Sequence, residues 1–413
     1  MSNLILGDTL VRIVRNANAR PHDAPYPDAL NRLLPITDFD RAFAEICAWP
    51  GYAPTPLIDL PGLARELGIA HLLYKEERHR FGLNSFKALG GAYAVMRVLA
   101  AELAKRGVKE PVASKDLADG RWRDVTRAIT VASATDGNHG RSVAWGARLF
   151  GCRCVIFIHE AVSEGRKAAI EAFGAEVIRI PGGYDDSIRH TFAQAAEHGW
   201  FVVQDTATAT YEDVPRDVTS GYAVMAREVL DQADQLPTHV VAQAGVGGLA
   251  SALLAQFWMH MPERPHVIVL EPTRADCVFQ SIARGTRSDV QITDETIMAG
   301  LSCGEVSTLA WPILRDGAAA AMAIDDRFAI EGMRRFADPS PGDPAIVAGE
   351  CSGGALGALL ALRGQPELRA TLGIHATSRI LLIGTEGDTD PTIYSQAVGR
   401  TAAQVLAAKR VSK

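Results

Sequence analysis

The residues best suited to chemistry lie in the stretch Asn84–Lys87, in which Ser85 stands two positions before Lys87. The small-residue stretch Ala88–Ala92 follows at once and is expected to begin a helix. A lysine held at the mouth of a helix, with a hydroxyl group close to it, can form an imine with an aldehyde cofactor. The sequence therefore makes Lys87 the candidate centre of the chemistry.

Composition indicates a globular protein that acts on small molecules. The chain has 413 residues, 47% of them hydrophobic, which is enough for two domains or for one domain inserted in another. A net charge of -6, without long runs of one sign, is not typical of proteins that bind nucleic acid or an anionic membrane. No signal peptide and no apolar stretch long enough for a membrane span are found, so a cytoplasmic protein is expected.

The six cysteines are too sparse for a disulfide scaffold in a chain of this length. Cys277 and Cys303 lie in one loop-rich region and would pair only if the fold brought them together. Buried thiols are the simpler interpretation.

Residues 127–205 alternate between strand and helix. Runs of β-branched residues predict strands, and stretches with helical periodicity lie between them. Such alternation is typical of βαβ units, in which helices wrap a parallel sheet. The expected strands are 128–133, 154–158, 176–180 and 201–204, and the expected helices are 139–150, 164–173 and 186–198.

A second series has expected strands at 72–75, 240–243, 267–270, 321–324 and 380–383, with helices at 249–259 and 355–362. We therefore predict an α/β fold with two open, mostly parallel, twisted sheets and helices on both faces. A large domain built from residues 1–90 and 210–413 would enclose a smaller inserted α/β domain of residues 91–209. The polar stretch 109–123 is expected to be an exposed loop.

Four turns stand out because ligands of such sheets bind where strands end and helices begin. Each turn places bare backbone and small polar groups at that edge, and each is expected to join a strand to a helix. The turns are residues 134–140, 245–250, 349–354 and 384–390.

The turn 245–250 is suited to a phosphate group. Its glycines let backbone N–H groups approach an anion closely, and the following helix would present its positive end. The same residues match the G-x-G-x-x-A pattern of dinucleotide-binding proteins, and Glu271 stands about 20 residues on, so NAD is an alternative ligand. A third interpretation is close packing of helix on strand with no ligand.

A single phosphate on a pyridine ring accounts for more of these turns than a dinucleotide does. Pyridoxal phosphate needs a lysine for its aldehyde, a phosphate cup, a side chain beside its ring hydroxyl and a partner for its ring nitrogen. The residues expected to fill these four roles are Lys87, then Gly245, Val246, Gly247 and Gly248, then Asn138, and Thr385.

These motifs resemble those of the tryptophan-synthase-β-like, or fold type II, pyridoxal phosphate enzymes, in order and spacing along nearly the whole chain. Within that superfamily the sequence is most similar to the diaminopropionate ammonia-lyase family. The resemblance implies a homodimer that converts 2,3-diaminopropionate, as the D isomer, the L isomer or both, to pyruvate and ammonia. It rests on residues 80–87, 134–140, 204–207, 298–301 and 384–387.

Two aspartates bear on the substrate. Asp136 could remove the α-proton from the face opposite Lys87 or bind a second ammonium group, and it could also be only a helix N-cap. Asp205 has the same ambiguity. The resemblance makes it the expected carboxylate for the β-ammonium group, with Ser85 and Thr135 as further substrate-binding residues. Lys87, displaced by the substrate amine, is then placed to take the α-proton.

Three functions stay open. The ammonia-lyase is favoured because two aspartates suit a cationic β-substituent, whereas a threonine or serine dehydratase of the same superfamily would remove a β-hydroxyl group. The third is a non-catalytic protein that binds an amino acid or NAD, and the presence of Lys87 argues against it. Asn138 is preferred to His139 beside the cofactor, because a side-chain amide there can hydrogen-bond the ring hydroxyl. No zinc-protease, serine-hydrolase or P-loop motif supports another chemistry.

Overall fold

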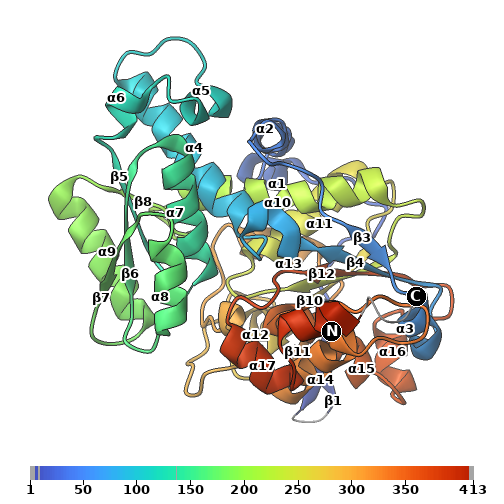
Figure 1. Ribbon diagram of the computed structural model, residues 1–413. Coiled ribbons are helices and arrows are strands. Elements are labelled where there is room, and N and C mark those ends of the chain that lie inside the picture. Colours follow the sequence, from blue (N-terminus) through green and yellow to red (C-terminus); the bar gives the residue numbers. More distant parts are fainter. Residues whose placement is uncertain (1–4, 8–9, 136, 409–413) are drawn as a thin grey trace. The chain divides into compact units, whose positions relative to one another are not determined.

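The computed structural model describes residues 5–7, 10–135 and 137–408, which form two compact units (Figure 1). Unit 1 comprises the described residues of 1–33, 54–79 and 225–413, and unit 2 comprises those of 34–53 and 80–224. Residues 34–53 and 80–90 belong to unit 2 because α2 (Ile36–Cys47) contacts α4 (Ala88–Lys105) and Lys87 lies at the start of α4. The ranges expected for two separately folding domains stay a prediction.

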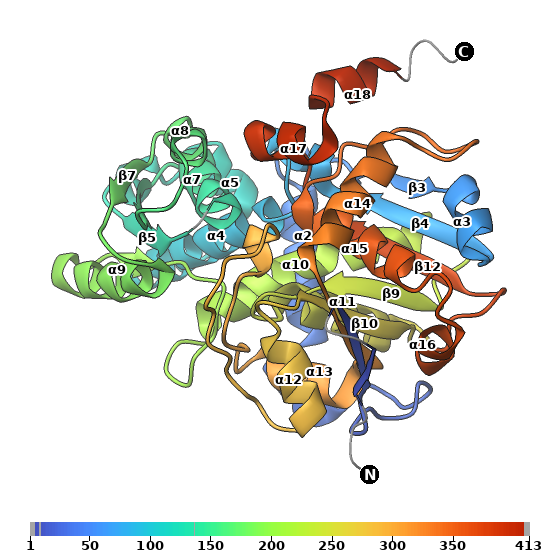
Figure 2. The same ribbon diagram turned by 90° about the horizontal axis from the view of Figure 1, so that it is seen from below.

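Unit 2 is built on a four-stranded parallel sheet with the order β7-β6-β5-β8. Helix α9 covers one face, and α7 and α8 cover the other (Figures 1 and 2). This is the predicted run of βαβ units. Its elements are β5 (Thr130–Ala134), α7 (Asn138–Phe150), β6 (Arg153–Ile158), α8 (Glu164–Glu171), β7 (Glu176–Arg179), α9 (Tyr184–His198) and β8 (Phe201–Val202).

Small residues let α4 lie close against α7. A Cβ atom on Gly91 would overlap Ser142, and one on Gly146 would come within 2.6 Å of Ala92 Cα. Glycine at both positions therefore permits an approach that any larger side chain would prevent. This packing explains the run of small residues that follows Lys87.

Unit 1 contains an eight-stranded sheet with the order β1-β2-β11-β10-β9-β12-β4-β3. The five strands from β11 to β4 are parallel, whereas β1, β2 and β3 run antiparallel to their neighbours at the two edges. The strands are β1 (Ile5–Gly7), β2 (Val11–Arg15), β3 (Leu57–Asp59), β4 (His71–Glu76), β9 (His239–Gln243), β10 (His266–Pro272), β11 (Ala320–Ile324) and β12 (Arg379–Gly384).

Helices cover both faces of this sheet. Helix α15 (Glu350–Ala361), buried at every residue, lies on one face with α14 (Asp326–Ala337) against it. Helices α11 (Gly248–His260) and α13 (Ala310–Gly317) lie on the other face (Figure 1). Gly353 and Gly357 allow α14 to approach α15, because a Cβ atom on either would come within 3 Å of backbone atoms of α14. The predicted α/β fold with two mostly parallel sheets is confirmed.

The remaining helices link these layers. Helix α10 (Asp213–Gln232) is the longest and includes residues of both units. The others are α1 (Asp28–Leu33), α3 (Pro61–Leu67), η1 (Glu77–Gly82), α5 (Ser114–Ala118), α6 (Arg123–Thr126), α12 (Cys277–Arg284), η2 (Ala299–Leu301), α16 (Pro366–Thr371), α17 (Pro391–Val398) and α18 (Ala402–Ala408).

Two local predictions are wrong. The stretch 109–123 contains α5 rather than only a loop, because Ser114 is buried and its backbone N–H donates to Glu45 Oε2 at 2.8 Å. The turn 349–354 opens α15, but no strand precedes it, since residues 343–349 have no regular structure. The apolar side chains of this segment, such as Val347, are instead buried in the core.

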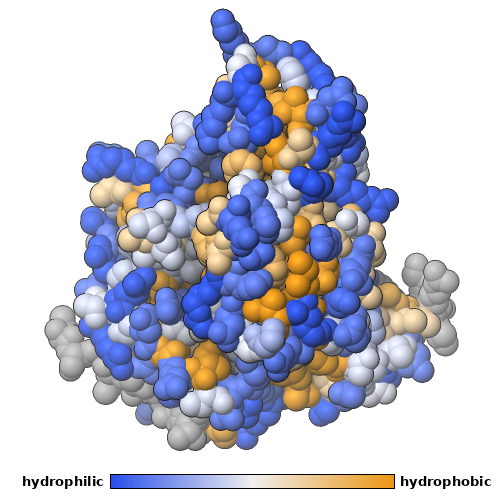
Figure 3. Space-filling model, turned by 90° about the vertical axis from the view of Figure 1, so that its left-hand side faces the viewer, coloured by the Kyte–Doolittle hydropathy of each residue, from blue (hydrophilic) through white to orange (hydrophobic). Residues whose placement is uncertain are grey.

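The described part of the chain contains no helix that is both long and apolar enough to cross a membrane. Figure 3, which views the side nearest to α9 in Figure 1, shows mostly hydrophilic side chains with apolar patches between them. Phe192 of α9 is the exposed large hydrophobic side chain among the described residues.

Three histidine rings, called the stack below, lie together at the amino ends of the central strands of unit 1. The rings of His239 and His266 are stacked, whereas the ring of His22 is tilted by 48° to that of His266. The ring of His266 lies 3.8 Å from that of His22 and 4.9 Å from that of His239, measured between centroids. Burial, with further contributions from nearby rings and cations, lowers the pKa of His239 and His266 to about 4, and burial also lowers the pKa of His22. The stack is therefore neutral at physiological pH.

We expect the free energy of unfolding to fall as the pH drops from above 6.5 to about 4. Between these pH values the three histidines bind protons in the unfolded chain but not in the folded protein. Their contribution to the pH dependence of the free energy of unfolding levels off at lower pH. Since the pKa of buried His239 is lowered from 6.5 to about 4, this residue alone would account for roughly 3 kcal/mol. Urea unfolding at several pH values measures the effect.

His266→Phe is the matched variant, because it keeps a stacking ring and removes one titrating group. Its free energy of unfolding is expected to vary less with pH than that of the unaltered protein. If the free energy of unfolding varied with pH equally in both proteins, the pH dependence could not be assigned to the histidine stack.

Candidate active site

Lys87 follows a tightly wound loop of unit 2. Two non-glycine residues of this loop have positive φ: Phe81 at 49° and Asn84 at 58°. Such backbone is uncommon outside glycine and clusters at functional sites. The side chain of buried Ser85 accepts a hydrogen bond from the Lys87 backbone N–H at 3.3 Å. The loop thereby holds Lys87 at the start of α4.

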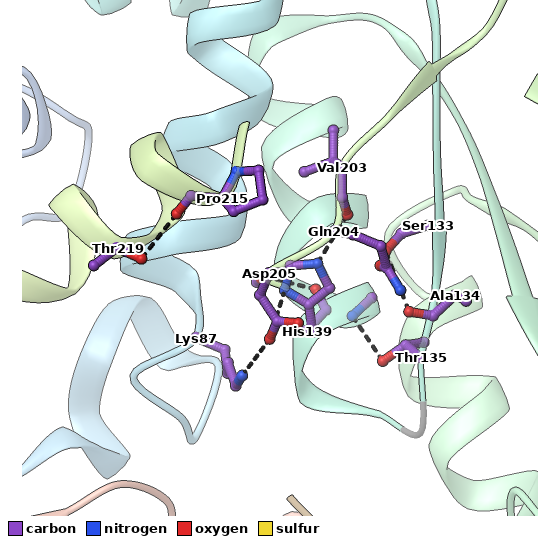
Figure 4. Close-up of polar contacts among 12 residues, drawn as sticks. Lys87, Ser133, Ala134, Thr135, His139, Val203, Gln204, Asp205, Pro215 and Thr219 are labelled. Atoms are coloured by element: carbon purple, nitrogen blue, oxygen red, sulfur yellow. Dashed lines mark hydrogen bonds and ion pairs between the residues drawn. The ribbon is translucent and has the colours of Figure 1, made fainter. Parts of the chain in front are cut away.

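Asp205 binds the amino group of Lys87. Lys87 Nζ donates to Asp205 Oδ2 at 2.7 Å, and the side chains are 20% and 14% exposed (Figure 4). Burial by itself would raise the pKa of Asp205, but the charge of Lys87 and the hydrogen bond from its Nζ hold the pKa well below its usual range. Asp205 is therefore an ionised carboxylate already paired with an ammonium group.

Two aromatic rings lie beside the same amino group. Lys87 Nζ is 5.5 Å from the ring centroid of Phe86 and 5.6 Å from that of Tyr222, and the two rings are 4.7 Å apart. Tyr222 can approach because a Cβ atom on Gly90 would overlap its ring. No motif in the sequence marks Tyr222, and α10 is far along the chain from Lys87, so the role of this residue is visible only in the structure.

His139 lies on the other side of Asp205. Its Nε2 is 2.9 Å from the carbonyl oxygen of Val203, and its Nδ1 is 3.8 Å from Asp205 Oδ2. Burial lowers the pKa of His139, although the charge of Asp205 opposes this effect. The sequence favours Asn138 over His139 as a site residue, whereas the structure places His139 close to the carboxylate of Asp205.

Hydrogen bonds hold the segment that carries Asp205. Ser133 Oγ of β5 donates to Gln204 Oε1 at 2.6 Å, while the Gln204 backbone N–H donates to the hydroxyl of Tyr211 at 3.0 Å. The same hydroxyl donates to the carbonyl of Val202 at 2.9 Å. Gln204, which lies in the motif 204–207, and Tyr211, which no motif marks, thus support the position of Asp205.

The turn 134–140 is organised by Thr135. Its Oγ1 accepts hydrogen bonds from the backbone N–H groups of Gly137 and Gly140, each at 3.0 Å. Asn138, within this turn, is the first residue of α7. Asp136 lies outside the described residues. The roles expected for Thr135, Asn138 and Asp136 stay predictions.

The turn after β9 offers a set of backbone donors in unit 1. From Gly245 to Leu249, the backbone N–H groups have no hydrogen-bond acceptor among the described residues, although this turn is at least partly buried. Gly247 has a φ of 93°, and α11 begins at the next residue. Free donors at a helix start fit a phosphate group.

Close packing also requires glycine in this turn. A Cβ atom on Gly245 would lie 2.9 Å from Cys303 Sγ, and one on Gly247 would lie 3.0 Å from Leu314 Cδ1. Close packing therefore accounts for these glycines, and the phosphate-binding role of the turn stays a prediction. No disulfide joins Cys277 to Cys303.

Thr385, at the end of β12, belongs to a buried group of hydroxyls. Its Oγ1 is 3.2 Å from Ser352 Oγ, which in turn donates to the carbonyl of Glu386 at 2.8 Å. Thr385 is 3% exposed. A neutral hydroxyl suits a pyridine nitrogen that is not kept protonated, in contrast to an aspartate.

Glu271 does not have the role that a dinucleotide site needs. Its carboxylate is fully buried and accepts hydrogen bonds from the backbone N–H groups of Val278 and Phe279 at 2.8 and 2.6 Å. Burial raises the pKa of Glu271 to about 8. The residue thus holds the first turn of α12 and is not exposed to a ribose, so the NAD alternative loses its support.

Each unit, taken by itself, holds groups whose chemistry suits pyridoxal phosphate: unit 2 holds a lysine amine, and unit 1 holds free backbone N–H groups and a neutral hydroxyl. A family model described as "Pyridoxal-phosphate dependent enzyme" matches residues 48–384. Diaminopropionate ammonia-lyase of Escherichia coli K12 is 39% identical over 362 residues, which cover 84% of this chain and 88% of that protein.

Solved structures agree with the sequence match. The holo crystal structure of diaminopropionate ammonia-lyase from Escherichia coli aligns with a TM-score of 0.84 at 37% identity, covering 96% of this chain and 98% of that one. Its complex with an aminoacrylate–pyridoxal phosphate azomethine reaction intermediate aligns with a TM-score of 0.83 at 35% identity, with the same coverage. The chain therefore belongs to the family of pyridoxal-phosphate-dependent enzymes that includes diaminopropionate ammonia-lyase.

Proposed function

We propose that this protein eliminates ammonia from 2,3-diaminopropionate and releases pyruvate, with pyridoxal phosphate as cofactor. The observation that carries the proposal is the partly buried contact between the Lys87 amino group and Asp205. It places a carboxylate suited to an ammonium group directly beside the lysine that would hold the cofactor. The match to diaminopropionate ammonia-lyase supports the same reaction.

Bound pyridoxal phosphate supplies an aldehyde for the substrate amine and a ring that withdraws electrons from the α-carbon. We assign Lys87 to the aldehyde, the turn from Gly245 to Gly248 to the phosphate, Asn138 to the ring hydroxyl and Thr385 to the ring nitrogen. Two features support the assignments in unit 1: the free N–H groups of the turn and the neutral hydroxyl of Thr385.

Side chains of the protein, rather than the cofactor, are assigned to proton transfer and substrate binding. Lys87 Nζ, once released, takes the α-proton from one face of the substrate, and we assign Asp136 as the base on the other face. Asp205 receives the β-ammonium group, as it receives the ammonium group of Lys87. Ser85 and Thr135 are proposed as further substrate contacts.

Pyruvate release from four amino acids tests the proposed function. We expect D- or L-2,3-diaminopropionate, or both, to be turned over with a higher kcat/KM than serine and threonine. The physical reason is that an ionised carboxylate beside the β-carbon stabilises an ammonium group more than a neutral hydroxyl. A preference for serine or threonine would instead identify the protein as a dehydratase.

The oligomeric state and the cellular compartment are proposed from the family resemblance. We propose a homodimer in the cytoplasm, with a small amino acid as the substrate. Sedimentation equilibrium of the holoenzyme would measure the mass of the assembly.

A further inference from the structure

One buried acceptor atom beside Asp205 has no partner. Nδ1 of His139 makes no hydrogen bond with any described residue, although the residue is only 7% exposed. Buried polar atoms are nearly always hydrogen-bonded, and an unmet one lowers stability. An atom of this kind within a site is expected to meet its partner in the ligand.

The hydrogen bond to Val203 determines which ring nitrogen of His139 carries the proton. A carbonyl oxygen only accepts, so His139 Nε2, at 2.9 Å from it, must carry the N–H. A neutral imidazole has one N–H, and Nδ1 is therefore a bare acceptor. The lowered pKa of His139 agrees with a neutral ring.

The bare Nδ1 and Asp205 Oδ2 lie 3.8 Å apart (Figure 4). Neither atom can donate to the other, because Asp205 is ionised and Nδ1 has no proton. Two adjacent acceptors are stabilised by a group that donates to both. Lys87 Nζ serves Oδ2 in the structure, but in the proposed function this nitrogen is required by the cofactor.

We propose that His139 Nδ1 and Asp205 Oδ2 form a two-acceptor site that selects a β-ammonium group over a β-hydroxyl group in the substrate. The inference rests on the proposed function and adds His139 to it as a specificity-determining residue. An ammonium group has three N–H donors and satisfies both atoms. A hydroxyl group has one O–H and leaves one buried acceptor unmet, which disfavours serine and threonine.

Two variants of His139 separate its two ring nitrogens. His139→Gln can keep a donor to Val203 at the Nε2 position and removes the acceptor at the Nδ1 position. His139→Asn can keep an acceptor near the Nδ1 position and removes the donor to Val203. The measured quantity is the ratio of kcat/KM for 2,3-diaminopropionate to kcat/KM for serine in each holoenzyme.

For His139→Gln we expect this ratio to fall roughly 10-fold, mainly through a lower diaminopropionate value, because one N–H donor of the bound ammonium group then has no acceptor. For His139→Asn we expect the ratio to stay close to that of the unaltered enzyme, even if the thermal midpoint drops. An equal loss for both substrates in His139→Gln, or an unchanged ratio, would overturn the proposal.

Nitrogen-15 NMR of histidine-labelled holoenzyme tests the proposal without turnover. His139→Gln identifies the His139 signals, and we expect Nδ1 to be unprotonated near neutral pH; a protonated Nδ1 would refute the two-acceptor site. Failure of the proposed function is distinguishable, since it would appear as no pyruvate from diaminopropionate in the unaltered enzyme.

Discussion

Lys87→Ala is expected to abolish pyruvate formation from 2,3-diaminopropionate, with a loss of at least about 10³-fold in kcat. The variant lacks both the amine that would hold the cofactor and the base for one face of the substrate. The visible absorption band of the bound cofactor, and its removal by borohydride, are expected to be lost as well. Steady-state kinetics and an absorption spectrum measure both effects.

Lys87→Arg is the matched control for the charge, because a guanidinium group can still pair with Asp205. We expect it to unfold close to the unaltered protein and to be as inactive as Lys87→Ala. Asp136→Asn, in contrast, should keep the absorption band and lose turnover of one isomer far more than of the other. Substantial activity in Lys87→Ala, with its band intact, would refute the central role of this lysine.

Lys75→Met is expected to lower the free energy of unfolding by about 3–5 kcal/mol, because it breaks a buried ion pair. In unit 1, Lys75 Nζ lies 2.6 Å from Glu228 Oε2, and the side chains are 0% and 1% exposed. Lys75 also donates to the Thr55 carbonyl and to Gln232 Oε1, both at 2.7 Å. Without the lysine, the Glu228 carboxylate is buried and loses its cation.

The double variant Lys75→Met with Glu228→Gln should regain much of this loss, because the amide removes the buried charge and can still accept from the Thr55 backbone N–H. Lys115→Met removes an exposed pair with Asp119 and is expected to change stability little. Urea unfolding of the four proteins completes the comparison. A double variant as unstable as Lys75→Met would show that the charge is not the cause.

Local patterns in the sequence were sufficient for the α/β fold and for most of the strands and helices. Period-2 and period-3.6 hydrophobic patterns act over a few residues, so they can be read without knowing distant contacts. The short edge strands β1 and β3 lack such a pattern, at three residues each. They form because neighbouring strands offer unpaired backbone groups, which is a property of the assembled sheet.

The types and positions of the residues near Lys87 likewise predicted a site in which a lysine holds a cofactor. The family match confirms that the cofactor is pyridoxal phosphate. The sequence could not tell whether Glu271 reads a ribose or holds a helix, since both uses place a carboxylate at the end of a strand. Burial of Glu271 against α12 decides for the helix.

The role of Lys87 was thus predicted from local residues, whereas the surroundings of this lysine depended on chain folding. Asp205, His139 and Tyr222 come from separate segments and meet Lys87 only because α4, α7 and α10 pack through glycines in unit 2. Hydrogen bonds and the desolvation of charges depend on distances of a few ångströms between such segments. The linear order of residues does not contain those distances, so the bare acceptor on His139 is visible only in the folded protein.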